Sequence, residues 1–154
     1  MNSRNKIRVL FVEDHAIVRD GLAAILAGEA DIEVVFQAGS AEEALAQFAK
    51  AAPDITLMDL RLPGMSGIAA IQEIRRMSPD ARIIVLSTYD SEEDIYRAIE
   101  AGARGYLLKA MLRHQLLDAI RSVHNGAKYI PPQIAAGSPT ASAGRICPGA
   151  SIRS

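Results

Sequence analysis

Five short, almost uninterrupted apolar runs alternate with stretches of helical periodicity between residues 5 and 127, and this alternation constrains the fold more than any other feature. Strands this apolar are typical of a parallel sheet whose two faces are both covered by helices. The pattern therefore predicts a doubly wound α/β domain with a five-stranded parallel sheet, flavodoxin-like, in the strand order 2-1-3-4-5. The predicted strands are residues 7–12, 32–36, 55–59, 82–87 and 105–108.

Capping residues mark the ends of several predicted helices. Ser40 and Glu43 form a capping-box pattern, in which the serine accepts a backbone N–H bond and the glutamate reaches back toward the cap. Asp14 is a candidate N-cap for the first helix, and Ser91 is one for the helix after the fourth strand. The apolar spacing of that later helix predicts that Ile99 faces inward.

The composition argues against several classes of protein. A length of 154 residues suits one domain plus a tail, and a net charge of −1 argues against a surface that binds nucleic acid over its whole extent. The single cysteine, Cys147, excludes an internal disulfide and fits the reducing cytoplasm. No apolar run approaches about 18 residues, and the N-terminal charges are not followed by an apolar stretch, so we expect neither a membrane span nor a signal peptide.

The end of the chain differs in character from the rest. Residues 137–154 are rich in small residues and proline and show no periodicity, which predicts a disordered or non-native tail. The sequence thus divides into a domain at residues 5–127, the start of a linker at 128–136, and this tail.

Polar residues follow four of the predicted strands. Glu13 and Asp14 come after the first strand, Asp59 ends the third, Ser87 ends the fourth, and Lys109 follows the fifth. A parallel sheet brings the carboxyl ends of its strands to one edge, and ligands bind where the strand order reverses. Clustered carboxylates repel one another and need either a cation or raised pKa values. Carboxylate oxygens with room for water suit Mg²⁺, so the sequence predicts a magnesium site.

Each of these residues, taken alone, also has a simpler interpretation. Asp59 could cap a strand in a solvated loop, Ser87 could be a turn residue, and Lys109 could be a solvated charge. Together, a carboxylate nucleophile, a divalent ion, an ammonium and a hydroxyl are the parts that phosphoryl transfer onto Asp59 requires. Their joint placement on four strand ends favours the functional interpretation.

This constellation resembles the receiver domain of two-component response regulators, over essentially all of residues 6–126. In that family a histidine kinase donates a phosphoryl group to an aspartate with Mg²⁺ bound, and an aromatic side chain then rotates inward. The motifs that carry the resemblance are Glu13-Asp14, Met58-Asp59-Leu60 with Pro63-Gly64 and Gly67, Ser87-Thr88, and Tyr106-Leu107-Leu108-Lys109.

The resemblance implies a role for each site residue. The phosphoacceptor would be a buried strand-end aspartate, and the switch residues would respond to the new phosphoryl oxygens. The implied roles are Asp59 as phosphoacceptor, Asp14, Asp59 and the backbone carbonyl of Arg61 as direct Mg²⁺ ligands, Glu13 as a ligand through water, Lys109 as the phosphoryl-binding lysine, Ser87 as the switch hydroxyl, and Tyr106 as the switch aromatic.

Further motifs resemble the NarL/LuxR-type subgroup, in which a linker and a DNA-binding helix-turn-helix domain follow the receiver. Residues 129–132 are similar to the start of that linker. Residues 137–154 are too few to hold a helix-turn-helix core, which suggests truncation, a vector-derived tail or a shifted reading frame. Ala110 stands where many receivers have a proline after a cis bond, so the geometry of the Lys109–Ala110 peptide stays open. The subgroup motifs are Glu13-Asp14-His15, Val18-Arg19, Gly21-Leu22, Leu86-Ser87-Thr88-Tyr89 and residues 103–109.

The resemblance implies a phosphorylation switch rather than an enzyme, with a sensor histidine kinase as partner. It also implies a homodimer formed on phosphorylation, either through the surface of the fourth helix, fifth strand and fifth helix or through the first and last helices. DNA would be bound only through the missing domain, and a stand-alone receiver acting by protein contacts is an alternative. Two alternatives fit the sequence less well. A Mg²⁺-dependent phosphohydrolase would need an acid at position 61, where the chain has arginine. A flavodoxin-like module that binds a nucleotide or flavin would place a phosphate after the first strand, where the chain has the acidic residues 13 and 14.

Overall fold

A computed structural model describes residues 6–62, 64–88 and 92–130. Within these residues the predicted alternation of strand and helix is confirmed. The elements are β1 (Ile7–Val12), α1 (Ala16–Ala27), β2 (Ile32–Ala38), α2 (Ala41–Ala51), β3 (Ile55–Asp59), α3 (Gly67–Met77), β4 (Ile83–Ser87), α4 (Glu92–Ala101), β5 (Gly105–Leu108), the 3₁₀ turn η2 (Lys109–Met111) and α5 (Leu112–His124).

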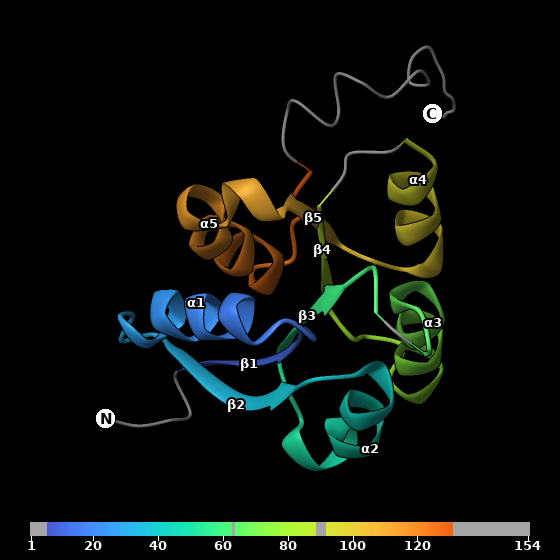
Figure 1. The fold of residues 1–154 in the computed structure, drawn as a ribbon, viewed down its shortest axis with the longest axis horizontal. Coiled ribbons are helices and arrows are strands. Elements are labelled where there is room, and N and C mark those ends of the chain that lie inside the picture. The colour runs from blue at the N-terminus through green and yellow to red at the C-terminus, as the bar shows by residue number, and fades with distance from the viewer. Residues whose placement is uncertain (1–5, 63, 89–91, 131–154) are drawn as a thin grey trace.

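The five strands form one parallel sheet in the order β2-β1-β3-β4-β5, as predicted. Helices α1 and α5 cover one face of this sheet, and α2, α3 and α4 cover the other (Figure 1). Each face has its own apolar core, one between the sheet and α1 and α5, the other between the sheet and the remaining helices. The central strand β3 is buried along its whole length. Both faces of the sheet are therefore shielded from water, which explains why the strands are so uniformly apolar.

The capping box at the start of α2 is confirmed, with one change of partner. The hydroxyl of Ser40 accepts a hydrogen bond from the N–H of Glu43 at 3.1 Å. The carboxylate of Glu43 reaches one residue further back than a standard capping box and accepts from the N–H of Gly39 at 2.8 Å. Strand β2 also runs two residues beyond the predicted end, to Ala38.

Two predictions about helices are wrong. The N-cap of α1 is His15 rather than Asp14, and no side chain caps that helix end. Ile99 has 37% of its surface exposed, whereas Ile95 and Ala98 are the buried residues of α4. The buried side of α4 lies between Ile95 and Ala98, and Ile99 lies at the outer margin of that side, although it is four residues from Ile95. The predicted cap Ser91 lies outside the described residues.

The chain continues past α5 with a short extended segment. Gly126, with φ of +98°, turns the backbone after α5 in the left-handed region, as its glycine predicts. Tyr129 then forms a parallel bridge with Gly105 of β5. The predicted tail at 137–154 lies outside the described residues. None of the helices in the described part of the chain reaches the length and hydrophobicity that a membrane span requires.

Candidate functional site

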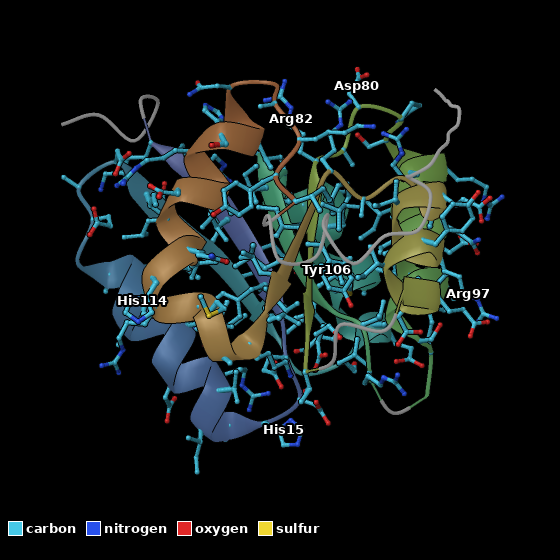
Figure 2. All side chains as sticks on the ribbon, turned by 90° about the horizontal axis from the view of Figure 1, so that it is seen from above. His15, Asp80, Arg82, Arg97, Tyr106 and His114 are labelled. Atoms are coloured by element: carbon cyan, nitrogen blue, oxygen red, sulfur yellow. The ribbon has the colours of Figure 1, made fainter. Side chains whose placement is uncertain are left out.

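The predicted site residues meet at the carboxyl edge of the sheet. Asp59 is the last residue of β3, Ser87 is the last residue of β4, Glu13 directly follows β1, and Lys109 directly follows β5. Figure 2 shows this edge from the side, with His15 at it and with Asp80 and Arg82 at the opposite end of the strands. The order of the strands explains the convergence, because β3 lies between β1 and β4.

An ammonium group lies between two buried carboxylates. The Nζ of Lys109 is 3.0 Å from Oδ2 of Asp59 and 2.9 Å from Oε1 of Glu13. Glu13 is fully buried and Asp59 is 1% exposed. Buried charges are stable only when they are paired, and here one cation is shared by two anions. The pocket therefore holds an excess of negative charge.

Burial and charge set the pKa values in this cluster. Burial raises the pKa of Asp59, and the negative charge of Glu13 adds to this, against the hydrogen bonds from Lys109 and the Arg61 N–H. Burial also disfavours the charged form of Glu13, but its bonds with Lys109 and His15 outweigh this and lower its pKa. The same partners, Glu13 and Asp59, raise the pKa of Lys109 although burial opposes them. Asp59 is thus the carboxylate whose charge is least well compensated.

Asp14 completes an acidic cluster beside Asp59. Ligand atoms of Glu13, Asp14, His15 and Asp59 lie within 4.8 Å of one another. The Oδ1 atom of Asp14 is buried and accepts no hydrogen bond from the described residues, and the His15 ring lies 3.3 Å from it. A carboxylate oxygen without a hydrogen bond, in an excess of negative charge, is what a hard divalent cation would satisfy. The donor set therefore fits Mg²⁺.

His15 belongs to this cluster, although the sequence assigned no site role to it. Its ring Nδ1 lies 3.0 Å from Oε2 of Glu13 and 3.3 Å from Oδ1 of Asp14, while the side chain is largely exposed. Its backbone N–H also donates to Glu13 at 3.1 Å. The adjacent Glu13-Asp14-His15 triplet was the available signal, but sequence alone does not show where the imidazole points.

The loop after Asp59 is tied to the site and to α4. The backbone N–H of Arg61 donates to Oδ1 of Asp59 at 3.1 Å. The guanidinium of Arg61 forms an ion pair with Asp94 of α4 at 2.6 Å. A surface groove of about 590 Å³, lined in part by Arg61, Ser66 and Asp94, lies beside this loop. The sequence predicted a role for the Arg61 backbone and missed the contact of its side chain with Asp94.

The two predicted switch residues are both buried. Ser87 and Tyr106 each have no exposed surface, and both make polar or ring contacts. In the β4–β5 register Ser87 pairs with Leu108, whereas Tyr106 pairs with Val85, two residues further from the site edge. The ring of Tyr106 already occupies the inward position, and it packs in the core beneath α3 and α4.

Gly67, at the start of α3, makes close backbone packing around Asp59 possible. A Cβ at position 67 would lie 2.5 Å from the carbonyl oxygen of Asp59 and 2.8 Å from Cα of Leu60. No real side chain tolerates such distances to backbone atoms. The glycine therefore lets α3 begin directly against the end of β3.

Comparison with known proteins gives a consistent result. The family profile described as "Response regulator receiver domain" matches residues 9–121. The chain is 36% identical over 132 residues to the transcriptional regulatory protein DegU of Brevibacillus brevis, covering 86% of this chain and 56% of that protein. It is 35% identical over 128 residues to the response regulator protein VraR of Staphylococcus aureus, covering 83% of this chain and 61% of that protein. The chain thus spans less than two thirds of these relatives.

Solved structures agree. A LuxR-family two-component response regulator from Aurantimonas sp. SI85-9A1 superposes with a TM-score of 0.82 at 35% identity, covering 85% of this chain and 94% of that chain. The signal receiver domain of the putative response regulator NarL from Mycobacterium tuberculosis superposes with a TM-score of 0.75 at 30% identity, covering 79% and 98%. The family profile, over residues 9–121, includes all of the strand ends that carry the site.

Proposed function

The chain belongs to the response regulator receiver domain family of two-component systems, with NarL/LuxR-type relatives, and from this premise we propose that Asp59 accepts a phosphoryl group from a sensor histidine kinase. The observation that carries the proposal is the position of Asp59. It is a buried carboxylate at the end of the central strand, 3.0 Å from the Lys109 ammonium and beside two further acids.

In the proposed reaction a carboxylate oxygen of Asp59 attacks the phosphorus of a phosphohistidine. A P–O bond forms, the P–N bond to the kinase imidazole breaks, and the leaving imidazole keeps the electron pair and takes up a proton. Catalysis of such a transfer consists mainly of positioning and of neutralising charge on the equatorial oxygens. The Arg61 N–H holds one Asp59 oxygen in place, and Lys109 supplies positive charge beside the other.

Mg²⁺ is the proposed cofactor, and when bound it would neutralise charge on the transferring oxygens. Asp14 and Asp59 would be direct ligands, with the backbone carbonyl of Arg61 as a third and Glu13 acting through water. The buried Oδ1 of Asp14, which accepts no hydrogen bond from the described residues, supports this assignment. With a divalent ion among the carboxylates, Lys109 could turn from them to an oxygen of the phosphoryl group.

The output of the switch is also a proposal. After phosphorylation, Ser87 would donate to a new phosphoryl oxygen, and Tyr106 would be held in the inward position. We propose a phosphorylation-dependent homodimer in the cytoplasm and, in a longer protein, control of transcription through a DNA-binding domain. The DegU relative, which carries the words "transcriptional regulatory" in its name and is longer than this chain, supports the last step.

A Mg²⁺-dependent phosphohydrolase fits less well. Such an enzyme commonly protonates its leaving group with an acid two residues after the nucleophile. That position is Arg61, a cation whose side chain is paired with Asp94. The chain is therefore proposed to be a phosphoacceptor that catalyses its own transfer and hydrolysis, and not a turnover enzyme.

Labelling by acetyl phosphate tests the proposal. The unmodified protein should gain one phosphoryl group per chain in the presence of Mg²⁺, detected as intact mass, and Asp59→Asn should gain none. Asp80→Asn, at the opposite edge of the sheet, is the matched control and should be labelled fully. Full labelling of the Asp59→Asn variant would contradict the assignment.

A further inference from the structure

Strand β5 lies at one end of the sheet, and its outer edge is the site of an additional contact. After α5 the chain returns to this edge, where Tyr129 forms a parallel bridge with Gly105. The N–H of Tyr129 donates to the carbonyl of Arg104 at 2.9 Å, and the N–H of Tyr106 donates to the carbonyl of Tyr129 at 3.0 Å. In Figure 1 the last coloured segment after α5 lies beside β5.

The two residues of this segment pack on opposite faces of the sheet. Tyr129 packs against the core beneath α1 and α5, and Ile130 packs against the core beneath α2, α3 and α4. Alternation between faces is the side-chain pattern of a β-strand. The phenol of Tyr129 is also partly withdrawn from water, since burial and the nearby charge of Asp118 raise its pKa. The segment is thus fitted to the edge by its side chains as well as by its backbone.

The contact involves Tyr106 directly. Its N–H points outward from β5, and an edge N–H is satisfied only by water or by an added strand. Ile130 joins the same apolar core that encloses the ring of Tyr106. The segment therefore acts on both the backbone and the surroundings of the residue that the family resemblance assigns as switch aromatic.

We infer that the outer edge of β5 is an interaction surface for an extended strand, and that the chain's own segment Tyr129–Ile130 occupies it. This docked segment holds Tyr106 in its buried position. The segment consequently lies beside Tyr106 at the outer edge of β5. A second copy could not pair strand to strand with β5 while the segment is docked. The inference concerns the unphosphorylated chain and holds whether or not Asp59 accepts a phosphoryl group.

Hydrogen exchange measured by NMR on the unmodified chain gives the first test. The amides of Tyr106 and Tyr129 should both be protected and should exchange at rates within about threefold of each other, because they open together as one unit. The amide of Leu57 in β3 should exchange more slowly than either, since it opens only with the sheet. Exchange of the Tyr129 amide at the rate of an unstructured peptide would overturn the inference without any variant.

Tyr129→Pro gives the second test, because proline has no N–H to donate to Arg104. The Tyr106 amide should exchange at least tenfold faster, and nitration of the Tyr106 ring by tetranitromethane should increase, while the Leu57 amide is unchanged. Tyr129→Phe keeps the N–H and the ring, and it should behave as the unmodified chain. Unchanged protection of the Tyr106 amide in Tyr129→Pro would overturn the docking, and unchanged nitration would overturn its effect on the ring.

Discussion

The Nζ of Lys109 and the Oδ2 of Asp59 lie 3.0 Å apart, although the two residues are 50 positions apart in the chain. The same ammonium reaches Glu13, so a single cation compensates two carboxylates that are withdrawn from water. Removing one partner from a buried ionic cluster is costly, because the charges that remain lose their compensation.

Lys109→Met should therefore destabilise the metal-free protein. We expect the free energy of unfolding in urea at neutral pH to fall by about 3 kcal/mol. Added Mg²⁺ should recover much of this loss, since it supplies positive charge to the same carboxylates. Lys128→Met, at an exposed position, is the matched control and should change stability little. Equal stability of the two variants without Mg²⁺ would show that Lys109 does not compensate the buried acids.

The fold followed from the sequence because the inner strands β1, β3 and β4 are buried on both faces, whereas the helices are buried on one. That difference in burial is visible in the pattern of apolar residues, and it placed β1, β3 and β5 at their observed bounds. The convergence of Glu13, Asp59 and Lys109 followed from the sheet order alone. Position along a strand decides which edge a residue reaches, and this needs no knowledge of side-chain conformation.

Features that depend on the direction of a side chain, or on contacts between distant residues, could not be predicted from the sequence. The pairing of Arg61 with Asp94 joins residues 33 positions apart, on a loop and a helix whose spacing the sequence does not specify. The complete burial of Tyr106 depends on side chains from distant parts of the sequence that pack around it in the core beneath α3 and α4. The bridge between Tyr129 and the edge of β5 involves a segment of only two residues. A segment this short shows no alternation of apolar and polar residues from which a strand could be predicted.

The pair of Arg61 and Asp94 should couple α4 to the loop that follows the phosphoacceptor. The side chain of Arg61 is 57% exposed, so we expect a coupling energy of only about 0.2–1 kcal/mol in a double-mutant cycle of Arg61→Gln and Asp94→Asn. The rate of acetyl phosphate labelling should also fall in these variants, and by more than the small change in stability would explain. The reason is that the Arg61 backbone N–H holds Asp59. The pair Arg76 and Glu73 on α3, equally ionic but remote from the loop, is the control cycle. Labelling that is equally insensitive to both cycles would contradict the coupling.

Gly67 and Gly21 provide a matched pair of substitutions to alanine with opposite expected signs. At Gly67 a methyl group would meet backbone atoms of Asp59 and Leu60 at 2.5 and 2.8 Å, so Gly67→Ala should destabilise by about 1–3 kcal/mol and displace Asp59. At Gly21, in the middle of α1, nothing lies within 4 Å, and alanine should stabilise by roughly 0.5–1 kcal/mol through helix propensity. Thermal unfolding of both variants measures the signs, and a stabilising Gly67→Ala would show that α3 can move away from β3.

Asp59→Asn should make the metal-free protein more stable at neutral pH, although it removes the phosphoacceptor. Burial, with the charge of Glu13, raises the pKa of Asp59 above its ordinary 3.8, so the folded state favours the protonated carboxyl. Below pH 3.8 the carboxyl is protonated in the folded and unfolded states alike, and its contribution to stability is fully present. As the pH rises through the raised pKa, the folded state must release the proton at a cost, and stability is lost.

The neutral amide of asparagine does not carry this cost. The difference in unfolding free energy between Asp59→Asn and the unmodified protein should therefore grow from pH 3.5 to pH 7, to a gain on the order of 1 kcal/mol for the variant. Urea unfolding in the presence of a chelator measures it, with Asp80→Asn as a control for loss of one negative charge. Added Mg²⁺ should reverse the order, because it stabilises only the protein that keeps all its carboxylates. A difference that stays constant with pH would show that the Asp59 carboxyl is not strained by its burial.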